Sequence, residues 1–305
     1  MHTEELFADD TNAIYKGKSY TELKKIIDKD LLKMSDWFKK NKLALNELKT
    51  KFIIFHKRHK KPPCSFSINL NGVDLERVDT IKILGVMINE NLDWSAHTHY
   101  ICNKISKSTA ILAKLKHYIP KYVLLTIFNS LCMSHISYAI SVWGGSPSNV
   151  LKRMKILQKK GIRHVCNAKY NSHTEPLFKQ CKVLNITDLY RLACVKLVYK
   201  KNQGLIHRYH VSKLPSKSES TDIVTRQSYD VVIRQQRHNR LYKTNSLNYK
   251  IGSSWNELPF DVKDKSSKVQ LSTFTRSVKS FYLSKYDDKY KCNNLHCYSC
   301  QLLRI

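Results

Sequence analysis

The hydrophobic and polar positions of this chain follow a mixed αβ pattern at its start and a helical pattern afterwards. Residues 20–43 carry apolar side chains at three- and four-residue steps, which predicts an amphipathic helix lying on a sheet. Two apolar runs within residues 65–78 flank Asn71-Gly72, a strong signal for a β-hairpin. Residues 81–88 are apolar on both faces, so we expect one strand that is buried between layers.

The β patterns end near Trp94, and helical periodicity dominates from there. The apolar stripe of the first helix consists of Ile101, Ile105, Ser108, Leu112 and Leu115. Lys107 and Lys114 fall on the opposite face, and Lys104 lies at its flank. Such a basic face either is simply solvated or contacts phosphates. We predict the α+β class, in which a small antiparallel sheet with one packed helix precedes mainly helical regions.

The charge of the chain points to a polyanionic partner. Its 305 residues include 53 Lys+Arg and 24 Asp+Glu, a formal net charge of +29, which is far more than solubility needs. Nucleic acid fits best, because we find neither a signal peptide nor a basic amphipathic helix that would anchor the chain to a membrane. Residues 122–151 lack charged side chains, yet their polar groups favour a buried helical hairpin over a membrane span. We therefore expect a soluble protein without membrane contact.

Asp9 and Asp10 are the first candidates for chemistry. They follow a short apolar run and precede Thr11-Asn12, as expected at the tip of a β-hairpin. Two consecutive side chains can serve one site only where the chain turns, because neighbouring strand residues point to opposite faces. Paired carboxylates hold hard divalent cations such as Mg²⁺ in two-metal phosphoryl chemistry. The plainer alternative is a solvated turn or a helix cap.

A series of short motifs gives the Asp pair a context. In chain order they are Phe7-Ala8-Asp9-Asp10-Thr11-Asn12, Trp37-Phe38, Lys49-Thr50-Lys51, Ile83-Leu84-Gly85-Val86, Asn91-Leu92-Asp93-Trp94, Val142-Trp143-Gly144, Leu157-Gln158-Lys159-Lys160-Gly161-Ile162-Arg163, His173-Thr174-Glu175-Pro176-Leu177-Phe178 and Trp255-Asn256-Glu257-Leu258-Pro259. Their order and spacing resemble the second half of the reverse transcriptase of non-LTR retrotransposons, close to the jockey-type elements of animals. The resemblance covers nearly the whole chain.

This resemblance implies three regions. Residues 1–92 would form the C-terminal part of the palm, with the Asp-Asp hairpin and the primer grip. Residues 93–145 would form a helical thumb that tracks the template-primer backbone. Residues 146–305 would form a helical C-terminal region with a basic surface, for which we expect contact with nucleic acid.

The resemblance also implies roles for single residues. Leu84-Gly85-Val86 would be the primer grip that holds the growing 3′ end, although a strand glycine can simply mark a bulge. Lys49 would assist the departing pyrophosphate, unless the nearby Lys51 takes that part or Lys49 is merely solvated. Lys104, Lys107 and Lys114 suit the thumb, because contacts that are blind to sequence are made to phosphates.

In such an enzyme Asp9 and Asp10 would bind Mg²⁺ or Mn²⁺, with RNA and DNA as template-primer and dNTP as the small-molecule substrate. The family also needs fingers and a third carboxylate from an earlier palm strand. Glu4 and Glu5 lie on the same strand as the pair and cannot supply it. We therefore expect this chain to be a fragment of an RNA-directed DNA polymerase that is inactive alone. A non-catalytic nucleic-acid-binding remnant, or a structural interaction module, are the alternatives.

The cysteines indicate a reducing compartment. There are nine, scattered and odd in number, without the spacing of a disulfide framework. We expect mostly buried thiols in a protein of the nucleus or cytoplasm that is not secreted. Cys297 and Cys300 have the spacing of a zinc-ligand pair beside Cys292, but a second pair at the usual loop distance is lacking, so we do not expect zinc.

Overall fold

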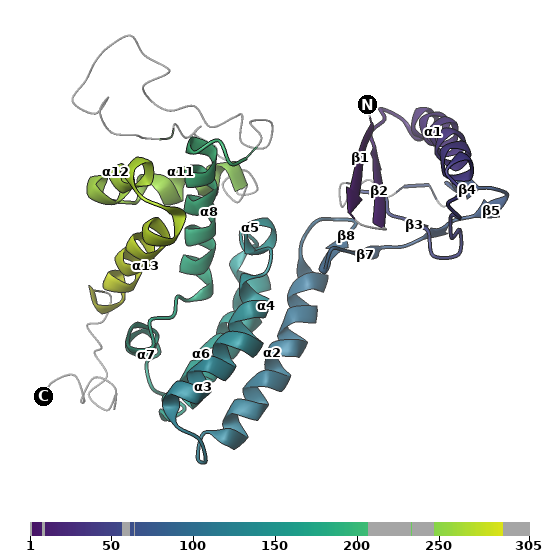
Figure 1. The fold of residues 1–305 in the computed structure, drawn as a ribbon. Helices are drawn as coiled ribbons and strands as arrows, with labels where there is room; N and C mark the ends of the chain where they lie inside the picture. The colour runs from purple at the N-terminus through teal and green to yellow at the C-terminus, as the bar shows by residue number, and fades with distance from the viewer. Residues whose placement is uncertain are drawn as a thin grey trace, which may run out of the picture. The chain divides into compact units, whose positions relative to one another are not determined.

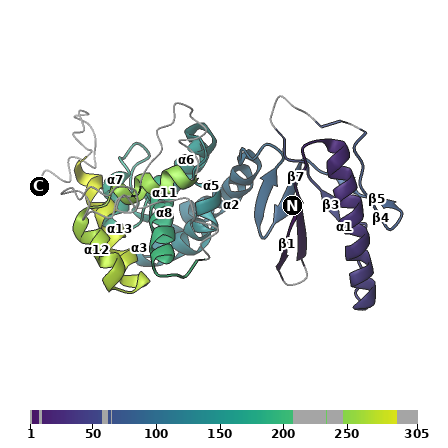
Figure 2. The same cartoon turned by 90° about the horizontal axis from the view of Figure 1, so that it is seen from above.

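The computed structural model describes residues 2–7, 10–56, 62–63, 65–206, 233 and 247–288. The chain divides into two compact units, Met1–Ala96 and His97–Ile305, here called the first and second units. The described strands lie in the first unit, and the described part of the second unit is mainly helical, as Figures 1 and 2 show. The predicted α+β class is confirmed.

The first unit contains short strands and one long helix. Its elements are β1 (His2–Phe7), β2 (Asp10–Tyr15), α1 (Tyr20–Lys40), β3 (Lys51–Phe52), β4 (Asn69–Leu70), β5 (Val73–Asp74), β6 (Glu76–Arg77), β7 (Thr80–Ile83) and β8 (Val86–Asn89). Helix α1 begins where the Ser19 side chain accepts a hydrogen bond from the Glu22 backbone N–H at 3.2 Å. The described strands form four two-stranded sheets: β1–β2, β4–β5 and β7–β8 are antiparallel, and β3–β6 is parallel. The single antiparallel sheet that we predicted is therefore subdivided.

The predicted buried strand over residues 81–88 is wrong, because this segment is the hairpin β7–β8. Its register pairs Ile81 with Ile88 and Ile83 with Val86, so these four side chains share one face. Lys82 pairs with Met87 on the other face. In one continuous strand, Ile81 and Ile83 would lie on one face and Val86 and Ile88 on the other, so the segment looks apolar on both faces. The two-residue turn brings all four side chains to the same face.

The hydrophobic core of the first unit lies between α1 and the segments that follow it. The buried side chains of this core are Ile27, Ile54, Phe66, Ile68, Leu70 and Leu75. The hairpin at Asn71-Gly72 is confirmed, with both residues at positive φ (53° and 87°), as a type I′ turn requires. It is shorter than predicted, because Glu76 and Arg77 pair with β3 instead.

The described residues from Ser95 onwards are mainly helical. Their elements are α2 (Ser95–Leu115), α3 (Lys121–Phe128), the π-helical turn η1 (Asn129–Met133), α4 (Ser134–Ser137), α5 (Ile140–Trp143), α6 (Ser148–Val165), α7 (Glu175–Gln180), α8 (Ile186–Asn202), α11 (Leu247–Asn256), α12 (Phe260–Lys268) and α13 (Leu271–Asp288). Large aromatic side chains fill their core, among them Phe128, Trp143, Trp255 and Phe274, each 0% exposed. Across the described ranges, no helix has both the length and the apolar character that crossing a membrane requires.

Candidate active site and nucleic-acid interface

The Asp pair belongs to the hairpin β1–β2. The antiparallel register runs from His2 opposite Tyr15 to Phe7 opposite Asp10, so the predicted hairpin is confirmed. Asp10 is the first residue of β2. Asp9 and the side chains of both aspartates lie outside the described residues. Their role in binding metal stays a prediction.

The two candidate lysines lie in different surroundings. Lys49 is exposed in a turn, where its backbone N–H donates to both the carbonyl and the side-chain oxygen of Asn46 at 3.1 Å. Within the described part of the chain, its ammonium group forms no ion pair. Lys51 lies on β3 and forms an ion pair with Glu76 at 2.6 Å. Among the described residues, the ammonium group of Lys49 thus has no ion pair to compete with a phosphate, whereas that of Lys51 does.

The predicted primer grip is the turn of the hairpin β7–β8. Leu84 and Gly85 connect the strands with φ angles of 45° and 82°, both in the left-handed region. Glycine adopts this conformation readily, whereas leucine does so at a cost. The Leu84 side chain is 44% exposed, and Val86 is buried. The turn thus holds an apolar side chain at the surface in a strained conformation, as is common at functional sites.

The motif Asn91-Leu92-Asp93-Trp94 follows the grip and forms the turn that leads into α2. The Asp93 carboxylate accepts hydrogen bonds from the Asn89 amide at 2.7 Å and from the Ser95 backbone N–H and hydroxyl at 3.0 and 2.6 Å. Leu92 and Trp94 have φ angles of 53° and 64°. Asp93 therefore fixes the start of the helix, which gives this motif a positioning role.

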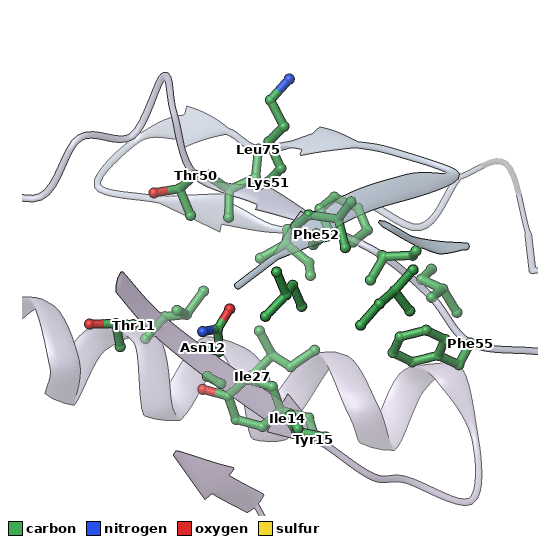
Figure 3. A pocket seen from close by; sticks show the side chains of 18 of the residues that line it. Thr11, Asn12, Ile14, Tyr15, Ile27, Thr50, Lys51, Phe52, Phe55 and Leu75 are labelled. Atoms are coloured by element: carbon green, nitrogen blue, oxygen red, sulfur yellow. The ribbon is translucent and has the colours of Figure 1, made fainter. Parts of the chain in front are cut away.

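One cavity of about 580 Å³ in the first unit connects these segments. Its lining includes Thr11, which follows Asp10, Thr50, which follows Lys49, and Leu84 of the grip. Figure 3 shows Thr11 and Thr50 at the cavity beside apolar side chains, while Lys51 extends its ammonium group away from them. The cavity thus brings together Leu84 of the predicted grip and two residues that adjoin predicted site residues, Thr11 and Thr50, whereas Lys49 itself does not line it. Sequence reasoning missed the cavity, since its lining comes from α1 and from strands and loops that are widely separated in the sequence.

Helix α2 carries the three predicted phosphate-binding lysines. Lys107 and Lys114 are exposed, and the predicted apolar stripe on the other face is buried at Ile101, Ile105 and Leu112. Lys104 is half-buried, with its ammonium nitrogen 4.6 Å from the centre of the Tyr100 ring. Among the described residues, none of these three lysines pairs with a carboxylate. Their charges are available to a polyanion.

The positive charge extends beyond α2. No Asp or Glu occurs between Asp93 and Glu175, although α6 in this interval is rich in Lys and Arg. Burial is the largest cause that lowers the pKa of His164, and the positive charges of Lys116 and Lys160 lower it further. Two lysines from distant parts of the sequence therefore act on the same imidazole. The absence of carboxylates was the signal in the sequence for this wider basic surface.

The described residues offer no alternative metal centre. Nowhere among them do three or more His, Cys, Asp or Glu side chains gather closely enough to hold an ion. Cys292, Cys297 and Cys300 lie outside the described residues. The paired carboxylates of Asp9 and Asp10 provide oxygen donors of the kind that Mg²⁺ and Mn²⁺ prefer.

Comparison with known proteins shows similarity to polymerases of mobile elements. The chain is 23% identical over 186 residues to the RNA-directed DNA polymerase from mobile element jockey of Drosophila melanogaster, covering 60% of this chain and 20% of that protein. The Drosophila funebris protein of the same name is 23% identical over 189 residues, covering 61% and 20%. The retrovirus-related Pol polyprotein from type-1 retrotransposable element R1 of Bradysia coprophila is 25% identical over 142 residues, covering 45% and 14%.

No family model matches the chain, and no solved structure matches it. The resemblance to reverse transcriptases of non-LTR retrotransposons is confirmed by these homologues. The chain spans only 20% of the length of the two jockey relatives.

Proposed function

We propose that this chain is a fragment of a non-LTR retrotransposon reverse transcriptase and that it binds an RNA–DNA template-primer. One observation carries the proposal: residues next to Asp10 and Lys49, together with Leu84, line the same cavity of the first unit. These are the three segments to which the resemblance assigns metal binding, pyrophosphate departure and the primer grip. The homologues named for RNA-directed DNA polymerases support the same reading.

The proposed division of labour follows the three predicted regions. Residues 1–92 are the C-terminal part of the palm, residues 93–145 the thumb, and residues 146–305 a basic C-terminal region. The carboxylates of Asp9 and Asp10 would hold Mg²⁺ or Mn²⁺, which when bound neutralises charge on the phosphates of dNTP.

The other candidate residues act by position and charge. Leu84-Gly85-Val86 places an exposed apolar side chain against the 3′ end of the primer. Lys49 offers a positive charge to the departing pyrophosphate, and Lys104, Lys107 and Lys114 contact backbone phosphates. Charges fixed in advance of the reaction stabilise the developing negative charge without reorganisation.

The catalytic test uses primer extension. We predict that the 305-residue chain, given primer-template, dNTP and Mg²⁺ or Mn²⁺, extends no primer. Two metal ions that stabilise both the attacking and the leaving oxygen need carboxylate ligands from two strands, and Asp9 and Asp10 supply the ligands on one side of such a site only. Fusion to the fingers and first palm strand of a jockey element should produce activity that Asp9→Ala abolishes. Asp36→Ala, on the exposed side of α1, is the matched control and should keep it.

Other results of the primer-extension test would support different functions for the chain. Extension by the unfused chain, lost in Asp9→Ala, would show that the third carboxylate comes from within these residues. A fusion without activity that still binds template-primer would favour the second candidate, a non-catalytic nucleic-acid-binding remnant. The carboxylate-free interval between Asp93 and Glu175 supports that candidate, because it favours phosphate binding without requiring catalysis.

A further inference from the structure

Two cysteines of the second unit lie side by side at the ends of two helices. Cys166 is the C-cap residue of α6, and Cys181 is the C-cap residue of α7. Their sulfur atoms are 3.4 Å apart, within hydrogen-bonding distance. The helix ends hold both residues in place, because the Cys166 backbone N–H donates to the Ile162 carbonyl at 3.1 Å and that of Cys181 to the Leu177 carbonyl at 3.0 Å.

Polar and charged groups surround this pair. The side-chain oxygen of Gln180 is 3.9 Å from the Cys166 sulfur. The pKa of the Cys181 thiol is lowered to about 7: a hydrogen bond from Cys166 is the largest cause, burial opposes it, and the ammonium group of Lys121, at the start of α3, adds a smaller lowering. The same interaction with Cys181 raises the pKa of Cys166, which therefore keeps its proton and acts as the donor. Near neutral pH a large share of the pairs therefore consists of a Cys181 thiolate beside a Cys166 thiol.

Other described cysteines of the second unit lack this activation. Cys132 and Cys194 are each 0% exposed, and burial raises the pKa of both thiols to about 11. Cys181 is 7% exposed, and its neighbour Cys166 is partly exposed, so a small oxidant reaches the pair from the side of Cys166. Reactivity should therefore be selective for Cys166 and Cys181.

We propose that Cys166 and Cys181 form a dithiol that hydrogen peroxide converts to a disulfide. The Cys181 thiolate attacks one peroxide oxygen, so that an S–O bond forms, the O–O bond breaks, and the hydroxide that leaves takes up a proton from solvent. The Cys166 sulfur then attacks the sulfenic sulfur. The S–S bond forms, the S–O bond breaks, and the departing hydroxide takes the Cys166 proton as water. Two thiols are oxidised by two electrons, and the peroxide is reduced to water.

The geometry requires little movement. The sulfur atoms, 3.4 Å apart, must approach by about 1.4 Å to reach the S–S bond length of about 2.05 Å. The bridge would join the C-terminal ends of α6 and α7, which are 15 residues apart in sequence at these positions. Oxidation would therefore tie the basic helix α6 to α7.

The test is peptide mapping of the full chain after peroxide treatment, with remaining thiols alkylated and no reductant added. Trypsin should release residues 164–169 and 180–182 as one disulfide-linked species that separates on reduction. Cys166→Ser should remove the link and leave a sulfenic acid at Cys181 that dimedone traps, whereas Cys181→Ser should remove both products. Lys121→Gln should slow the oxidation several-fold, and Lys182→Gln, which also removes a lysine charge next to Cys181 in sequence, is the matched control that should not.

A measurement on the wild-type chain keeps the proposal falsifiable if a variant fails to fold. In the native protein, Cys181 should react with iodoacetamide several-fold faster than Cys132 and Cys194. Equal rates for these cysteines, or peroxide treatment that oxidises others and leaves residues 164–169 and 180–182 unlinked, would overturn the proposal.

Discussion

At the scale of single residues, Leu84 shows a conflict between conformation and residue type. A leucine at φ 45° costs about 1 kcal/mol, and asparagine tolerates this region better. We predict that Leu84→Asn keeps or raises the free energy of unfolding but weakens template-primer binding. Leu92→Asn is the matched control, because Leu92 has a φ of 53° and is 49% exposed but lies outside the grip. Denaturant unfolding and fluorescence anisotropy measure the two effects; equal loss of binding in both variants would contradict a special role for Leu84.

His97 makes stability depend on pH at the same scale. It is buried with its ring edge-on to Trp143, and burial lowers its pKa from 6.5 to about 4. Between these values the unfolded chain binds the extra proton, so stability falls as the pH drops from about 6.5 to about 4, by up to about 3 kcal/mol. His97→Gln should flatten this part of the stability profile, whereas Thr98→Ser should keep its slope. Urea unfolding between pH 7 and 4 checks this.

At the scale of elements, Gly161 lets α6 approach α3. A Cβ atom at this position would lie 2.6 Å from a ring carbon of Phe128, which is 0% exposed and cannot move aside easily. We predict that Gly161→Ala destabilises the chain by about 1–2 kcal/mol, because the steric cost exceeds the roughly 1 kcal/mol gained in helix propensity. Phe128→Leu should reduce that penalty in the double variant. Purely additive effects in thermal unfolding would contradict direct contact between the helices.

At the scale of the whole molecule, the net charge of +29 should make nucleic-acid binding strongly salt-dependent. The logarithm of affinity should fall linearly with that of salt concentration, with little preference for sequence. Replacing Lys107 and Lys114 by Gln should reduce the slope by about 2. The same replacements at Lys24 and Lys33, which are exposed on α1, are the matched control and should change it less. Affinity that is constant between about 50 and 200 mM salt would contradict the prediction, and no binding would favour an interaction module.

Local signals in the sequence determined the α+β class, helix α1 and the turn at Asn71-Gly72, because hydrophobic periodicity and turn chemistry act between near neighbours. The homologues confirm the resemblance, while the roles of single site residues remain predictions. Only the tertiary structure decided that β7 and β8 fold back on each other, that β3 pairs with β6, and that Cys166 meets Cys181. These features depend on contacts between separate segments, whose geometry comes from packing around a shared core rather than from any local pattern.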